Sequence, residues 1–337
     1  MVRIISKELL AKEREKWQFA DGFDLRHVTR DVPENPKMIA EFIGTDNFAA
    51  AWTERRRYEV DAGRDEEPIL YTPIYDIVED SSLPKNVQIS RIGPGAVIFE
   101  EVKEGGEVKF VTVGETDFSV PIRHYAAGLE YSKDLRIYNE LWNVAIVERQ
   151  GGIAHNALLN NIHFNPILAY AYAAANQTAA SAVGSTLEEK YLRTIEDAIT
   201  NSKADTTNPR RGPYDLAIAS GNMFMVERAL RRVAQQGFDK QSSAISMVQN
   251  VIVYDGWTGQ RGKKSVTYSG VTTGTAYLVS KMRKAEDFRS FVKQSLQMVM
   301  GNPDVSRFIE EQVVWDLYLG AYANPLRAVE EITWPTS

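Results

Sequence analysis

The side chains best suited to acid–base or metal chemistry in this sequence are its four histidines, His27, His124, His155 and His163. A helix that binds a metal through histidines presents them on adjacent turns, as the HExxH motif does. His155 and His163 are eight residues apart, which does not match that spacing. We therefore expect His124 and His155 to have structural or surface roles.

No other combination of residues indicates catalysis. Neighbouring carboxylates, such as those at 100–101 and 330–331, belong to solvated faces far more often than to acid–base pairs. The sequence contains no HExxH, Walker A, GxSxG or GxGxxG motif and no nucleophile paired with a base. It also contains no cysteine, which excludes disulfides, thiolate catalysis and cysteine–zinc sites. We expect no catalytic residue, no cofactor, no metal site and no enzymatic activity.

The composition predicts a globular protein of two or three lobes. The chain has 337 residues, of which 44% are hydrophobic and 25% charged, and its formal net charge is −6. That charge argues against a dedicated nucleic-acid binder. Short basic clusters, for example at 55–57 and 210–211, are read either as solvated surface or as contacts with nucleic acid or an acidic neighbour. No apolar run is long enough to span a bilayer, and the charged N-terminus is unlike a signal peptide, so we expect a cytosolic chain when it is made.

The stretch that positions the rest of the chain runs over residues 125–176. Apolar side chains recur there at steps of three and four residues, which predicts one long helix with Ser132 as a plausible cap. Gly151 and Gly152 interrupt the pattern, so the helix either kinks or passes a close neighbour at this point. Pro166 marks its end. We interpret this helix as a spine on which the other segments pack.

Residues 87–122 predict a two-stranded ribbon. Apolar and polar side chains alternate on both sides of the sequence EGGE at 104–107, a strong hairpin signal. A two-stranded ribbon is marginally stable alone in water and needs a surface to lie on. That surface is either another subunit or a larger sheet of the same chain. Residues 1–62 have two short helical segments, at 6–19 and 47–58, but too few periodic apolar residues for a core, which predicts an N-terminal arm.

The second half of the chain alternates between strand and helix patterns. A capping box at 185–188 opens a helix that runs to about residue 199, and a polar linker at 203–213 is a candidate domain boundary. The remaining expectations are strands at 214–219, 248–255, 275–280 and 310–323, helices at 220–236 and 286–300, a functional or mobile loop at 256–274, and a strand at 329–334 beside the one at 310–323.

The order of these parts resembles the major capsid proteins of tailed bacteriophages, which have the Hong Kong 97-like fold. Residues 127–151 look like that family's passage from extended loop to spine helix. PYDLAIAS followed by a helix, and then VIVYDGW, look like the core of its axial domain, and AYANPLRAVEEITWP looks like its closing strands. The resemblance implies an α+β fold with an N-terminal arm at 1–62, an extended β-hairpin loop at 63–124, a peripheral domain with a long spine helix at 125–212 and 308–337, and an α/β axial domain at 213–307.

The resemblance also implies a function. The chain would self-assemble through hexamers and pentamers into an icosahedral head that encloses packaged double-stranded DNA without sequence-specific binding. It would lie in the virion capsid, and in the host cytoplasm during assembly, with scaffolding, portal and possibly decoration proteins as partners and no membrane. Contacts between subunits are expected from ribbon residues Val97, Phe99, Lys103, Val108, Lys109 and Phe110, and from arm residues Trp17, Arg55, Arg56 and Arg57. Some relatives cross-link lysine to asparagine, but no local signature extends that chemistry to Lys103 or Lys109.

Two alternatives stay open at the level of sequence. The same shell architecture serves bacterial nanocompartments of the encapsulin type, which enclose enzymes instead of DNA. The other alternative is an α/β enzyme that uses residues 256–274 as a lid.

Overall fold

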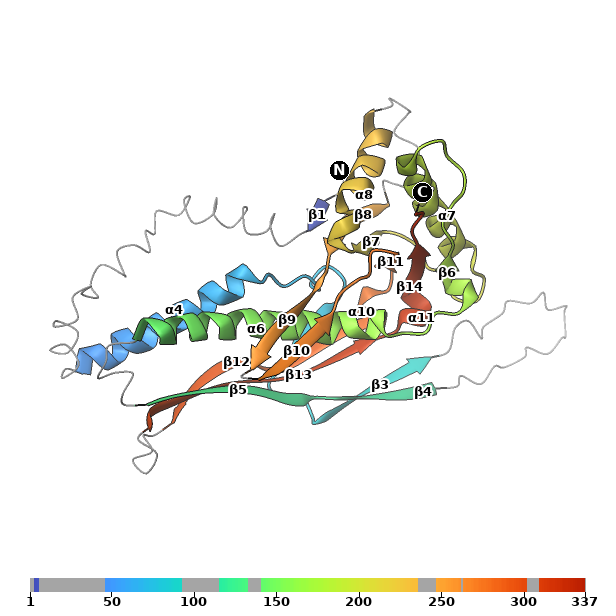
Figure 1. Ribbon diagram of the computed structural model, residues 1–337. Helices are drawn as coiled ribbons and strands as arrows, with labels where there is room; N and C mark the ends of the chain where they lie inside the picture. Colours follow the sequence, from blue (N-terminus) through green and yellow to red (C-terminus); the bar gives the residue numbers. More distant parts are fainter. Residues whose placement is uncertain are drawn as a thin grey trace, which may run out of the picture.

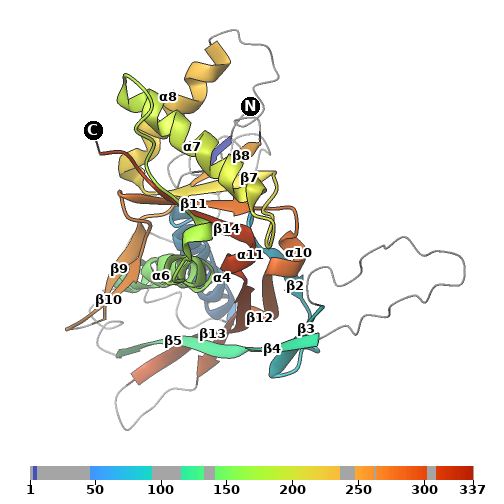
Figure 2. The same cartoon turned by 90° about the vertical axis from the view of Figure 1, so that its right-hand side faces the viewer.

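The long helix α6 lies at the centre of the molecule, with a four-stranded sheet below it and a six-stranded sheet with two helices above one end (Figure 1). The computed structural model describes residues 3–5, 46–92, 115–132, 141–235, 247–261, 263–301 and 309–336. A view turned by 90° looks almost along α6 and shows the two sheets on either side of it (Figure 2).

Helix α6 (Leu141–Leu168) confirms the predicted spine. It runs through both glycines without a break, and Pro166 lies inside it, two residues before its end. Ser132, the predicted helix cap, is instead the last residue of strand β5, and residues 133–140 lie outside the described part of the chain. The described helix therefore begins later than the pattern suggested.

Helix α4 (Asp46–Glu66) is longer than the helical segment predicted at 47–58 and packs along α6. It also runs past residue 62, the predicted limit of the N-terminal arm. Its inward side includes Arg56 and Val60, so a polar residue shares the buried face with an apolar one. A stripe of this kind gives a weak periodic signal, which explains why only part of the helix was expected.

The sheet below α6 has the strand order β2-β12-β13-β5. Its strands are β2 (Asp76–Glu79), β5 (Arg123–Ser132), β12 (Phe288–Gly301) and β13 (Ile309–Ala323). The prediction of a helix at 286–300 is wrong, because this segment is β12, and only the single turn α10 (Lys284–Asp287) before it is helical. The pairing of β12 with β13 shifts register between Val292 and Gln294 and again between Gln294 and Gln297. Such irregularities break the period of two and leave apolar spacings that imitate a helix.

The six-stranded sheet has the order β1-β8-β7-β11-β14-β6, and helices α7 and α8 lie beside it. Its elements are β1 (Arg3–Ile5), β6 (Gln177–Thr178), β7 (Tyr214–Ile218), β8 (Val248–Val253), β11 (Thr275–Ser280), β14 (Val329–Thr333), α7 (Leu187–Ala204) and α8 (Ser220–Gln235). The strands predicted at 214–219, 248–255 and 275–280 and the helix at 220–236 are confirmed. Strand β14 pairs with β11 and β6, so the expectation that it lies beside 310–323 is wrong. The short helix α11 (Pro325–Ala328) separates the two strands, and the chain enters the other sheet after it.

Helix α7 begins one residue later than the predicted capping box. Thr186, and not Ser185, is the N-cap, and it exchanges hydrogen bonds with Glu189 instead of Glu188. Ser185 still contributes, because its backbone N–H and hydroxyl both donate to the Glu189 carboxylate at 2.8 and 2.7 Å. One turn further along α7, Arg193 pairs with Glu196 at 2.8 Å.

Two hairpins complete the fold. Strands β9 (Gly256–Arg261) and β10 (Lys264–Ser269) pair antiparallel, so the loop predicted at 256–274 is largely a β-hairpin. Strands β3 (Asn86–Ile92) and β4 (Glu115–Pro121) confirm that the flanks of the predicted ribbon are paired strands, while residues 93–114 lie outside the described residues.

The described residues form two large hydrophobic cores. One core fills the space between α6 and the sheets and includes Phe164, Ile167 and Phe288. The other lies under α7 and α8 and includes Ile195, Leu216 and Val226. Strand β12 falls in the sequence range predicted for the axial domain but pairs in the lower sheet, and β14 does the reverse. Consecutive segments are thus exchanged between the two layers, which ties them into one body.

Candidate functional site

The described residues contain no group of three or more His, Cys, Asp or Glu side chains that could hold a metal ion. His163 is fully buried: its ring stacks on Tyr71 with 3.5 Å between centroids, and its Nε2 lies 2.8 Å from Ser290 Oγ. Burial lowers the pKa of His163 to about 4 and likewise that of His155. Both are neutral structural residues at physiological pH, so the role predicted for His155 is confirmed.

His124 differs because it lies on the exposed outer face of the lower sheet. Its ring stacks on Tyr318 with 4.3 Å between centroids, and its Nε2 is 3.4 Å from Asp316 Oδ2. This exposed position agrees with the structural or surface role that the sequence predicted for His124.

Helices α4 and α6 approach each other closely where they cross. A Cβ atom added at Gly152 would lie 2.1 Å from the backbone oxygen of Val60, and one added at Gly63 would lie 1.9 Å from that of Arg149. By contrast, a Cβ at Gly151 would meet nothing within 4 Å. Of the two explanations offered for the glycine pair, the close neighbour is therefore confirmed for Gly152.

Polar contacts reinforce this crossing. The Arg56 Nε and Glu148 Oε1 atoms are 3.2 Å apart, and their side chains are 0% and 2% exposed. The Asn156 amide donates to the backbone oxygens of Arg64 and Glu67, both at 2.7 Å. Since both ends of this network lie within one chain, α4 is fixed to the spine by the subunit itself.

Asn160 continues the polar stripe of α6 by one turn. Its amide oxygen accepts from the Leu70 N–H at 2.9 Å, and its amide nitrogen donates to the Pro68 carbonyl at 3.0 Å. Together with Asn156 it satisfies the backbone of the segment that leaves α4, which would otherwise be buried without partners. Sequence reasoning missed this role. The available signal was two asparagines four residues apart inside an otherwise apolar helical pattern.

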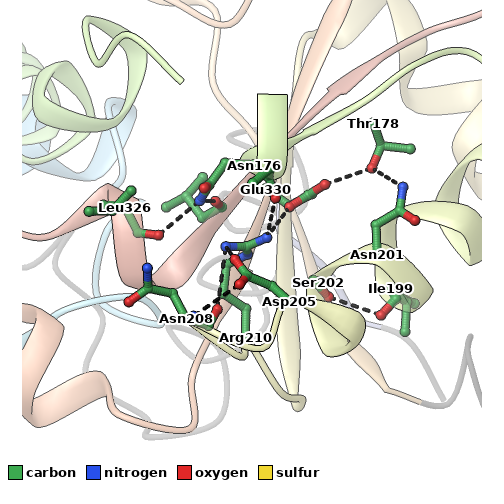
Figure 3. A network of polar contacts seen from close by, with 12 residues as sticks. Asn176, Thr178, Ile199, Asn201, Ser202, Asp205, Asn208, Arg210, Leu326 and Glu330 are labelled. Carbon is green, nitrogen blue, oxygen red and sulfur yellow. Dashed lines mark hydrogen bonds and ion pairs between the residues drawn. The ribbon is translucent and has the colours of Figure 1, made fainter. Parts of the chain in front are cut away.

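A second joint holds the C-terminal strand to the segment before β7 (Figure 3). The Arg210 guanidinium lies 2.8 Å from Glu330 and 2.9 Å from Asp205, and it donates to the Ala175 carbonyl at 2.8 Å. Arg210 is 1% and Glu330 0% exposed. Burial raises the pKa of Glu330, while backbone N–H donors led by that of Asn208 lower the pKa of Asp205.

The same joint contains two further anchors. The Thr178 hydroxyl donates to Glu330 at 2.7 Å, and the Asn176 amide donates to the carbonyls of Leu326 and Val329 at 2.8 and 3.0 Å. Arg210 therefore joins three distant parts of the sequence: the stretch after α6, the 203–213 segment and β14. The segment predicted as a polar linker is anchored at this point, and no local sequence signal indicated the pairing.

The predicted contact residues have different positions. Trp17 and the ribbon residues Val97, Phe99, Lys103, Val108, Lys109 and Phe110 lie outside the described residues. Arg55 is part of α4. Arg56 was expected on the contact surface, but it is fully buried beside Glu148 of its own chain, so its position differs from that expectation. Arg57 is exposed and lines a cleft between α4 and the lower sheet.

At its base the ribbon rests on the subunit. Val87 and Ile89 of β3 pack against a small cluster formed by Val120, Phe291 and Tyr322. Phe118 of β4 is 39% exposed. The ribbon therefore starts from the lower sheet, close to the junction of β4 and β5 (Figure 1).

Comparison with solved structures identifies the fold. The mature capsid of bacteriophage PhiM1 matches with a TM-score of 0.54 and 10% identity over 80% of this chain and 88% of that chain. The capsid of cyanophage P-SCSP1u matches with a TM-score of 0.52 and 10% identity over 80% and 89% of the two chains. A chain from Mycobacterium phage Bobi matches with a TM-score of 0.50 and 13% identity over 80% and 92%. No family model and no curated protein sequence matches the chain.

These similarities define the class of fold. The chain has the capsid-protein fold of tailed bacteriophages, the Hong Kong 97-like fold, as the order of its parts predicted. Among the described residues, no helix is long and apolar enough to cross a membrane.

Proposed function

We propose that this chain is a major capsid protein that self-assembles into the icosahedral head of a tailed phage and encloses packaged double-stranded DNA. The observation that carries the proposal is the extent of the shared fold, which covers 80% of this chain and 88% of the PhiM1 capsid chain. Two features of the molecule support it: the described residues offer no metal-binding cluster, and their most elaborate contacts are joints between segments of the chain.

In this proposal, copies meet head-to-tail around fivefold and sixfold axes through the lobe that contains the six-stranded sheet. Head-to-tail interfaces close into rings when the rotation between copies allows it. The ribbon beyond β3 and β4 extends to a neighbouring copy. Burial of its apolar residues, such as Val97, Phe99, Val108 and Phe110, would stabilise each contact by about 25 cal/mol for every Å² removed from water.

The net charge is consistent with a container for DNA. Tight binding of phosphates requires a large excess of Lys and Arg, whereas this chain has a formal net charge of −6. We infer enclosure of the genome without sequence-specific binding. Scaffolding, portal and decoration proteins are the further partners proposed, and the host cytoplasm and then the virion are the proposed locations.

Electron microscopy of negatively stained, purified protein tests the proposal. The chain is expressed alone and with its neighbouring phage genes, and the particles are treated with nuclease before their contents are extracted. Closed shells that protect double-stranded DNA when the packaging genes are present would support the head function. Shells that hold a protein cargo would indicate a nanocompartment, and a monomer that turns over a small molecule would refute both.

A further inference from the structure

We draw no further inference here: the strongest candidate, the cleft of about 420 Å³ between helix α4 and the lower sheet, with Val60, Met298 and Trp315 in its apolar lining and the exposed Arg57 on its rim, carries nothing because no contact among the described residues shows what covers it.

Discussion

Replacement of Gly152 by alanine should destabilise the subunit, whereas the same change at the adjacent Gly151 should stabilise it. At position 152 the new Cβ atom would lie 2.1 Å from the Val60 oxygen and 2.8 Å from the Arg64 nitrogen, both backbone atoms that cannot rotate away. Ordinary contact begins at 3.4 Å. Helices α4 and α6 would have to separate by more than 1 Å at this crossing to relieve the overlap.

The two substitutions gain the same helix propensity, but only Gly152→Ala also overpacks the contact between the helices. Alanine is favoured over glycine in a helix by about 1 kcal/mol, and this gain applies equally to both positions. Overpacking of a well-packed contact costs about 1–3 kcal/mol. The difference in the free energy of unfolding between Gly151→Ala and Gly152→Ala therefore isolates the packing cost, and we expect it to be about 1–3 kcal/mol.

Urea denaturation of unassembled subunits, followed by circular dichroism, measures this difference. Gly63→Ala should resemble Gly152→Ala, because its Cβ would lie 1.9 Å from the Arg149 oxygen. The double variant Gly63→Ala with Gly152→Ala should cost less than the sum of the two, since one separation of the helices relieves both overlaps. Equal stability of Gly151→Ala and Gly152→Ala would refute the close crossing of the helices.

Three further predictions concern the interior and one helix end. Arg210→Met should lower the free energy of unfolding by about 3–5 kcal/mol, because it leaves the buried Glu330 carboxylate without its cation. In urea denaturation, the double variant with Glu330→Gln should recover part of this loss. A double variant that is less stable than Arg210→Met alone would contradict the prediction. Burial lowers the pKa of His163 from 6.5 to about 4, so the unfolded chain takes up this proton at a higher pH than the folded chain does. The stability that neutral His163 contributes is therefore complete above pH 6.5 and falls by about 3 kcal/mol as the pH drops from 6.5 to 4. His163→Gln should flatten the pH dependence of the free energy of unfolding in this range. Thr186→Ala should lower the free energy of unfolding by about 1 kcal/mol through loss of the cap, whereas Thr200→Ala in the same helix should change it little, and equal effects would argue against the cap.

The elements that could be predicted from sequence are those whose buried side chains recur with the regular spacing of a helix or a strand. The helix α7 carries Ile195 and Ile199 on one face, and β7 is an uninterrupted buried run, so the local pattern and the final structure agree. β12 was predicted as a helix because its register shifts disturb the alternation. The sequence of the β9–β10 hairpin predicts a loop because no residue of β10 is buried, so its apolar and polar side chains need not alternate.

The joints of the subunit could not be predicted because their partners are remote in the sequence. Arg210 and Glu330 are 120 residues apart, and each resembles an ordinary surface charge in its local context. Arg56 was predicted as a contact with another molecule because the run 55–57 has no apolar neighbour pattern, yet the fold places Glu148 against it. The Gly152 contact was one of two stated possibilities, since a glycine inside a helix costs stability and must be compensated by what approaches it.

The buried joints of the subunit and its exposed charges should respond differently to salt. At the crossing of α4 and α6 and around Arg210, the charges lie within the chain and are almost fully buried. Salt and neighbouring copies have little influence on such buried pairs. Arg57 is instead exposed, and water and salt weaken the interactions of such a charge. A change of salt should therefore alter the interactions of the exposed Arg57 more than it alters the cohesion of the subunit itself.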